Sequence, residues 1–277
     1  ASAQAEPENG GYRLSGKWPF ASGCDHADWA LLGVTFPPKG NDEQTQQGFL
    51  LVKESEFTIQ DDWFVVGLAG TGSKTVVCDD QFIPERRRVL LAELNTGLTP
   101  GAKALDSPLY RIPLLSALPS SIISPALGIL DGAIRDFISA TGTKQTRGAV
   151  VAGGAKVAEF ATVQGRVGEA SASLAAGKAL VHSELRKIQK HSKSGKPFAI
   201  DQRIQARLSQ AFSVRLAVQG IDAIYGATGG AGLYLGHRIQ RAWRDIHAVS
   251  HHVSLNWDAV STMYGQHSLG LEPKGQY

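Results

Sequence analysis

The stretch S-P-A-L-G-I-L-D-G-A-I-R-D-F-I-S-A-T-G, residues 124–142, marks the point at which the pattern of the chain changes. Its apolar side chains recur with the period of a helix. Ser124 suits a helix N-cap, and Pro125 suits the first helical position, where its missing N–H costs nothing. We therefore expect a helix over about 125–142.

Three further long helical segments follow, separated by short breaks of glycine or polar residues. We place them at about 154–191, 200–226 and 233–264. Long helices joined by short loops favour an antiparallel four-helix bundle, which we assign to 111–277. The second segment is rich in Ala, Gly and Ser, a composition that allows close helix approach and often accompanies an oligomer seam.

The chain before about residue 105 consists of short apolar runs broken by turn residues. Four runs are typical of strands by length and by β-branched or aromatic content: Trp29–Phe36, Phe49–Val52, Trp63–Val66 and Thr75–Cys78. Short strands at this spacing predict a small antiparallel β-barrel or sandwich, assigned to 1–110. The expected fold class is α+β, with a β domain followed by the bundle.

Composition excludes several classes of function. The 277 residues carry 28 basic and 25 acidic side chains, a balance that argues against a nucleic-acid surface. Cys24 and Cys78 are too few for a disulfide framework and lack metal-ligand spacing, so we expect free thiols in a reducing compartment. The apolar run 149–163 is interrupted by glycines and charges, and the first ten residues lack a signal pattern. A cytoplasmic protein without a membrane span is expected.

Two motifs of the β half belong together. The first is W-P-F-A-S-G-C-D-H-A-D-W at 18–29, and the second is G-L-A-G-T-G-S at 67–73. Each alone is a turn between strands, since Ser and Gly are turn formers. Together they resemble the flavin-facing part of the acyl-CoA dehydrogenase superfamily, and within it the oxygenase components of the 4-hydroxyphenylacetate 3-hydroxylase type. The resemblance extends in consistent order from Gly16 to Pro273.

The resemblance implies specific flavin contacts in these motifs. It aligns Ser22 with the hydroxyl that hydrogen-bonds near flavin N5. A flavin C4a-hydroperoxide decays by losing peroxide, and a fixed hydroxyl at N5 in a site closed to water prolongs it. The alternative is a turn without a flavin role. The cofactor-binding residues implied here are Trp18, Phe20, Ser22, Gly23, Cys24, Thr71 and Ser73.

Two further features resemble the phosphate side of the superfamily's flavin site. The run 226–232, G-A-T-G-G-A-G, is no dinucleotide fingerprint, because it follows a helix and lacks an acidic residue at the expected distance. In the superfamily such a turn contacts the flavin, which implies Gly229 and Gly230; a helix C-cap is the alternative. Arg147 resembles the arginine that reaches a neighbouring subunit's flavin phosphates, with a surface arginine as the alternative.

The segment R-A-W-R-D, 241–245, resembles the superfamily's terminal R-x-x-R-D motif. Acyl-CoA dehydrogenases often place their glutamate base shortly after it, at the position of Val253 here, and a valine cannot take a proton. The hydroxylases carry a histidine there, which matches His252. Its implied role is general-base help to a phenol, because histidine titrates in the right range.

The other histidines are weaker candidates. His251 and His252 point about 100° apart on a helix, so at most one should face the flavin. His26 is an alternative base, although a structural role suits its position beyond the turn. His247 and His251 have the i, i+4 spacing of a metal pair, but no third ligand is evident, so no metal is expected.

The expected function is that of the oxygenase component of a two-component flavin-dependent monooxygenase. It would hydroxylate a phenolic or other aromatic substrate with molecular oxygen, using reduced FMN or FAD from a partner NAD(P)H:flavin reductase. The superfamily's shared flavin sites imply a homotetramer. An acyl-CoA dehydrogenase-like oxidoreductase, an N- or S-heteroatom monooxygenase and a non-catalytic assembly subunit stay open. The family's N-terminal helical domain has no counterpart in the sequence, so we expect either a shortened chain or an open pocket.

Overall fold

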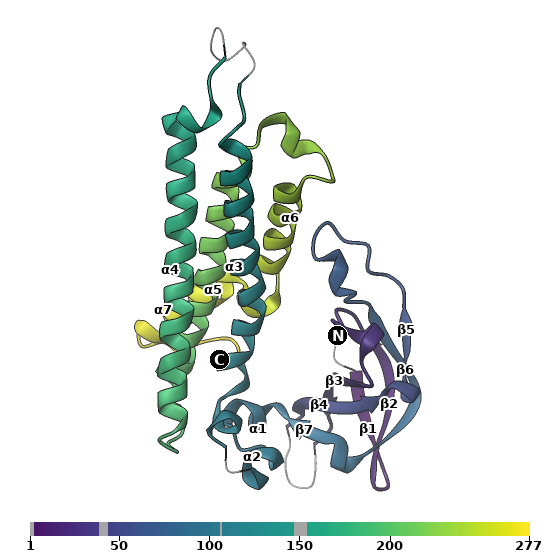
Figure 1. Cartoon of the computed structure of the whole chain (residues 1–277). Coiled ribbons are helices and arrows are strands. Elements are labelled where there is room, and N and C mark those ends of the chain that lie inside the picture. The colour runs from purple at the N-terminus through teal and green to yellow at the C-terminus, as the bar shows by residue number, and fades with distance from the viewer. Residues whose placement is uncertain (1–2, 39–43, 106, 147–153) are drawn as a thin grey trace. The chain divides into compact units, whose positions relative to one another are not determined.

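The computed structural model describes residues 3–38, 44–105, 107–146 and 154–277. By internal contacts the chain divides into two compact units (Figure 1). The β unit comprises Ala1–Val65 and Ala69–Pro113, and the helical unit comprises Val66–Leu68 and Leu114–Tyr277. The α+β class is thereby confirmed.

In the β unit, the residues that the structure describes form one curled, mixed sheet of seven strands in the order β5-β6-β2-β1-β3-β4-β7. Every neighbouring pair is antiparallel except β1 and β3, which run parallel, so the expectation of a purely antiparallel domain was wrong in this respect. Leu14, Leu50 and Ile83 are fully buried in its core. The elements are β1 (Ala3–Glu8), β2 (Gly11–Trp18), β3 (Trp29–Phe36), β4 (Gln46–Lys53), β5 (Thr58–Gln60), β6 (Thr75–Pro84), β7 (Arg88–Leu90), α1 (Leu91–Thr96) and α2 (Pro100–Ala104).

One predicted strand is absent. Trp63–Val66 forms no strand, and the carbonyl of Val66 accepts a hydrogen bond from the guanidinium of Arg244. The polar segments that form β1 and β2 were not predicted as strands. These segments form strands because β1 pairs with β3 and β2 pairs with β6, although their polar composition alone does not favour strands.

The described residues of the helical unit form five α-helices, and the first four of these, with Leu255, supply one apolar core. Ile221, Ile224 and Ile246 are completely buried in it. The predicted helix 233–264 is instead two helices, because the one-turn helix η8 (Val253–Leu255) interrupts it and Asn256 then caps the next helix through a bond from Ala259 N to its Oδ1 of 3.0 Å. The helices are α3 (Leu114–Thr141), α4 (Ala161–Ser192), α5 (Ile200–Tyr225), α6 (Arg238–Ser250) and α7 (Trp257–Ser268).

Helix α3 begins well before the predicted N-cap, so Pro119 and Pro125 both lie inside it. A proline inside a helix costs about 3 kcal/mol or more. Burial of Leu115 and Ile123 offsets that cost, and Ile123 belongs to the unit's apolar core. By length and composition α3 is also apolar enough to span a membrane, contrary to the sequence expectation, but Ile123 and its neighbours are buried against the other helices.

Candidate functional site

The two motifs of the β unit meet through their hydroxyl groups. Ser22 Oγ lies 2.8 Å from Ser73 Oγ, and Ser73 Oγ lies 2.7 Å from Thr71 Oγ1. The backbone supports this chain, because Gly23 N donates to Thr71 O at 3.3 Å and Ala21 N donates to Lys74 O at 3.0 Å. Residues about fifty positions apart therefore form one row of three hydroxyls, which we call the hydroxyl chain.

The turn that carries Ser22 has an unusual backbone. Phe20 has a φ of 65°, and Gly23 has a φ of 77°. The left-handed region is costly for a residue with a side chain, and such residues cluster at functional sites. The ring of Phe20 is 72% exposed and meets Trp63 edge-to-face at 6.0 Å. An exposed aromatic ring beside the hydroxyl chain is suited to stacking on a planar ligand.

Two other predicted residues of this motif are buried. Trp18 is 6% exposed, and its indole N–H donates to Gly33 O at 2.7 Å. Cys24 is buried as well, with Sγ 3.6 Å from Gly72 O. Both side chains therefore already have partners within the β unit, whereas Phe20 and Ser22 stay exposed.

Charged side chains form ion pairs and hydrogen bonds around the same turn. Lys74 Nζ lies 3.1 Å from Asp25 and 3.2 Å from Asp61, and these hydrogen bonds raise the pKa of Lys74. Asp62 accepts from the hydroxyl of Thr75 at 2.6 Å and from its N–H at 3.0 Å, and the hydroxyl bond chiefly lowers the pKa of Asp62. Lys74 thus links the two motifs next to the hydroxyl chain.

In the helical unit, Val66–Leu68 is held by α6. Leu68 N donates to Asp245 Oδ1 at 2.7 Å, and Arg244 Nη1 donates to Val66 O. A Cβ on Gly67 would lie 2.3 Å from Arg244 O, so only glycine allows this approach. The R-x-x-R-D motif therefore binds a backbone segment, a role that its sequence pattern did not reveal.

His252 lies just beyond α6, at the start of η8. Its Nδ1 accepts the N–H of Ser254 at 3.1 Å. A backbone N–H can only donate, so in the neutral ring the proton resides on Nε2. Burial against protein atoms, and then the positive charge of Arg207, lower the pKa of His252. The side chain nevertheless stays exposed. It is therefore a neutral, accessible imidazole at neutral pH.

His247 has a structural role. Its Nε2 lies 2.9 Å from Asp222 Oδ1, which also accepts the indole N–H of Trp243 at 2.7 Å. The rings of Trp243 and His247 are 4.5 Å apart. These contacts occupy the histidine, and the residues that the structure describes contain no group of three metal-ligating side chains.

The remaining predicted residues are at exposed turns or outside the described chain. A Cβ on Gly229 or Gly230 would meet no atom within 4 Å, and Gly229 has a φ of 67°. This turn is therefore open enough for a ligand to approach its backbone. Arg147 lies outside the described residues.

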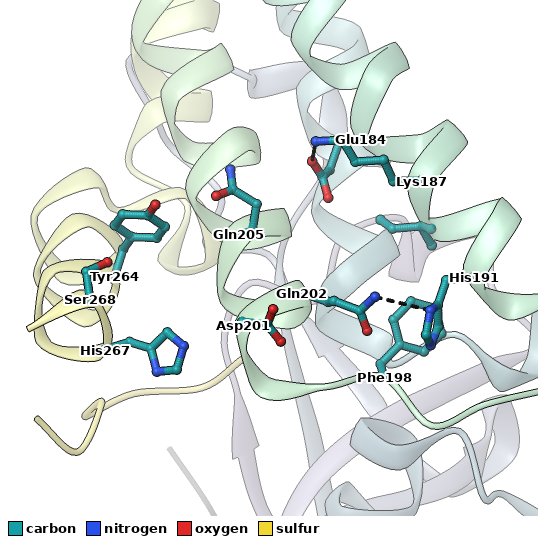
Figure 2. Close-up of a pocket in the computed structure, with 11 residues that line it drawn as sticks. Glu184, Lys187, His191, Phe198, Asp201, Gln202, Gln205, Tyr264, His267 and Ser268 are labelled. Carbon is teal, nitrogen blue, oxygen red and sulfur yellow. Dashed lines mark hydrogen bonds and ion pairs between the residues drawn. The ribbon is translucent and has the colours of Figure 1, made fainter. Parts of the chain in front are cut away.

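The helical unit also contains a cavity of about 460 Å³ between α4, α5 and α7 (Figure 2). Glu184 is buried in it, with Lys187 at 3.3 Å, and Gln202 bonds His191 at 3.1 Å. None of the predicted site residues that the structure describes lines this cavity. A buried carboxylate disfavours the anionic phosphates of a flavin, so we do not assign the flavin here.

Comparison with known proteins defines the family. The family model "Acyl-CoA dehydrogenase, C-terminal domain" matches residues 120–257. The FADH(2)-dependent resorcinol hydroxylase, oxygenase component, of Rhizobium sp. (strain MTP-10005) is 45% identical over 99% of this chain and 68% of its own length. The chain belongs to the oxygenase components of reduced-flavin-dependent monooxygenases, within the acyl-CoA dehydrogenase superfamily.

Solved structures agree with this assignment. The 3-HSA hydroxylase from Rhodococcus sp. RHA1 superposes with a TM-score of 0.90 at 28% identity, over 99% of this chain and 69% of that chain. XiaF from Streptomyces sp., solved with FADH2 and glycerol, has a TM-score of 0.88 at 26% identity, over 100% of this chain and 68% of that chain. The chain thus spans about two thirds of the length of these relatives.

The predicted family and reaction class are therefore confirmed. The protein is an oxidoreductase of the flavin-dependent aromatic hydroxylase type, and the acyl-CoA dehydrogenase alternative is not favoured. The absence of a carboxylate at Val253 agrees with this result, because that position lacks a base for proton abstraction.

Proposed function

We propose that this chain carries out hydroxylation of a phenolic ring with reduced FAD, and that Ser22 and His252 are its catalytic residues. The observation that carries the proposal is the hydroxyl chain, which lies in the motif that resembles the flavin-facing turn of the superfamily. Reduced FAD with molecular oxygen would supply the electrons and the oxygen atom that is transferred to the ring. A partner NAD(P)H:flavin reductase would supply the reduced flavin.

The hydroxyl chain fits a flavin nitrogen chemically. In both of its hydrogen bonds either oxygen can be the donor. Ser22 is therefore able to accept a hydrogen bond from a ligand N–H, or to donate one to a ligand lone pair, when the chain reverses direction. The proposed role of Ser22 is to hold flavin N5 in one hydrogen bond and so to slow loss of hydrogen peroxide. Phe20 would stack on the ring system, and Gly229 with Gly230 would admit its phosphate side.

The geometry of His252 favours a donor role over the general-base role expected from the sequence. Its Nδ1 is already occupied by Ser254 N–H, and the proton of the neutral ring resides on Nε2. We infer that Nε2–H donates to the phenolic oxygen of the substrate. Such a donor stabilises negative charge on that oxygen and thereby raises electron density on the ortho carbon of the ring.

The relatives' names support a phenol as the substrate, and FAD rather than FMN as the flavin. The resemblance to the superfamily carries the proposal of a homotetramer, and the outer surface of α4, where a Cβ added at Gly165 or Gly168 would meet no atom within 4 Å, is open to a neighbouring subunit. A cytoplasmic location suits the two free thiols, Cys24 and Cys78.

The test measures hydroxylated product and hydrogen peroxide after chemically reduced FAD, oxygen and resorcinol are mixed with the protein. We expect product from the wild type, and mostly peroxide from Ser22→Ala. Ser121→Ala is the matched control, because this exposed serine on α3 bonds only Leu118 O of its own helix, at 2.6 Å. Failure to form product from resorcinol and from related phenols, with FAD bound, would refute the proposed reaction.

A further inference from the structure

Arg207 on α5 is a buried charge without a partner charge. It is 4% exposed, and no carboxylate among the described residues forms an ion pair with it. Its Nε has no hydrogen-bond partner in the described part of the chain. Burial alone lowers the pKa of Arg207 to about 10. An uncompensated buried charge costs stability, so this residue is a candidate for a role in function.

The hydrogen bond that Arg207 does make reaches the turn that carries His252. Its Nη1 donates to Ser254 O at 2.6 Å. Ser254 N in turn donates to His252 Nδ1 at 3.1 Å. Ser254 therefore binds Arg207 through its carbonyl oxygen and His252 through its N–H.

The positive charge of Arg207 favours the same neutral form of His252 that the hydrogen bond from Ser254 requires. Burial first, and the guanidinium second, lower the pKa of the imidazole. The neutral ring is the form in which Nδ1 can accept the N–H of Ser254. Arg207 thus favours one protonation state and, through Ser254, one tautomer.

We propose that Arg207 is a positioning residue for hydroxylation: it holds residues 252–254 so that His252 presents Nε2–H to the substrate. This inference rests on the proposed function of His252 as the donor to the phenolic oxygen. Arg207 itself touches neither substrate nor flavin in this account. Its effect passes through the carbonyl of Ser254 and through its charge.

The experiment compares Arg207→Met, which is similar in size but removes both the charge and the donor, with Arg207→Lys, which keeps a charge and a donor. Arg186→Met is the control, because Arg186 is an exposed arginine on α4 that also donates to a backbone carbonyl, His182 O at 3.2 Å. The ¹⁵N resonances of labelled histidine, with His252 identified by His252→Gln, report its tautomer and pKa. Product per reduced flavin reports the reaction.

In the wild type and the control we expect a protonated Nε2 and an unprotonated Nδ1. Arg207→Met should mix the two tautomers, raise the pKa of His252 and lower product per flavin about tenfold, the lower end of the loss seen when residues that orient metal-binding histidines are removed. Arg207→Lys should retain most of the wild-type tautomer preference, His252 pKa and product per flavin. If Arg207→Met does not fold, Arg207→Gln replaces it in the experiment. The inference then requires that the pKa of His252 in Arg207→Gln is higher than in the wild type.

Unchanged His252 resonances in Arg207→Met would overturn the inference, and so would unchanged product yield despite shifted resonances. The proposed function fails separately. If His252→Gln hydroxylates as well as the wild type, then His252 is not the donor, whereas the resonances still test whether Arg207 sets its tautomer.

Discussion

Replacing Gly67 by alanine should release Val66–Leu68 from α6. The new Cβ would lie 2.3 Å from Arg244 O and 3.0 Å from the Cβ of Ala248, so the segment must move away by about 1 Å to reach ordinary contact distances. That movement breaks the bond from Leu68 N to Asp245 Oδ1 and the bond from Arg244 to Val66 O. Hydrogen bonds to charged groups contribute about 1.5–3 kcal/mol each when buried.

Because the segment is only partly buried, we expect a loss of about 2–3 kcal/mol rather than the sum of two such bonds. That free energy corresponds to roughly 30- to 150-fold faster hydrogen exchange of the Leu68 amide, at about 1.4 kcal/mol per factor of ten. Hydrogen-exchange mass spectrometry of the peptide that contains Leu68 measures this directly.

Gly70→Ala is the matched control. A Cβ at Gly70 would meet no atom within 4 Å, so exchange at Leu68 should stay within about twofold of the wild type. Wild-type exchange in Gly67→Ala would refute the argument that close approach to Arg244 O holds this segment.

Three further predictions concern single residues. Ser73→Ala removes the middle of the hydroxyl chain, so it should raise peroxide per reduced flavin by about as much as Ser22→Ala does. A Ser73→Ala variant that forms hydroxylated product from all of its reduced flavin, with no peroxide, would contradict the role of the chain. Since the pKa of His252 lies below the usual 6.5, Nδ1 takes up a proton only at lower pH, where it can no longer accept the N–H of Ser254 and the ring is no longer held in place. The hydroxylation rate should therefore fall below pH 6.5, and His252→Gln should abolish this acid limb. Burial raises the pKa of Cys78 to about 11, so iodoacetamide at pH 8 should leave Cys78 unlabelled until urea unfolds the protein; rapid labelling of the native protein would contradict its burial.

Local pattern predicted much of this structure. The change from short apolar runs to helical periodicity separated strands from helices. The turn motifs at 18–29 and 67–73 were grouped by resemblance alone, and the bond between Ser22 and Ser73 is a finding of the structure. Tertiary packing decided the remainder. Pro125 lies inside α3 because the buried side of that helix continues upstream of the proline, although proline normally marks a helix start.

The supporting residues of the site could not be predicted from local pattern. Arg207 lies on α5, far along the chain from the turn that it binds, and nothing in its neighbours distinguishes it from a surface arginine. Asp245 belonged to a recognised motif, but its partner, the N–H of Leu68, carries no side-chain signal. Both residues act on backbone atoms, which a sequence pattern does not reveal.

The central claim is that Ser22 and His252 act on one flavin and one substrate. A crystal structure of the protein in its native assembly, with reduced FAD and a phenol under anaerobic conditions, tests this most directly. The account predicts Ser22 Oγ within hydrogen-bond distance of flavin N5 and His252 Nε2 within that distance of the phenolic oxygen, at about 2.7–3.2 Å. Flavin bound away from Ser22, or His252 turned to a surface that no ligand reaches, would contradict it.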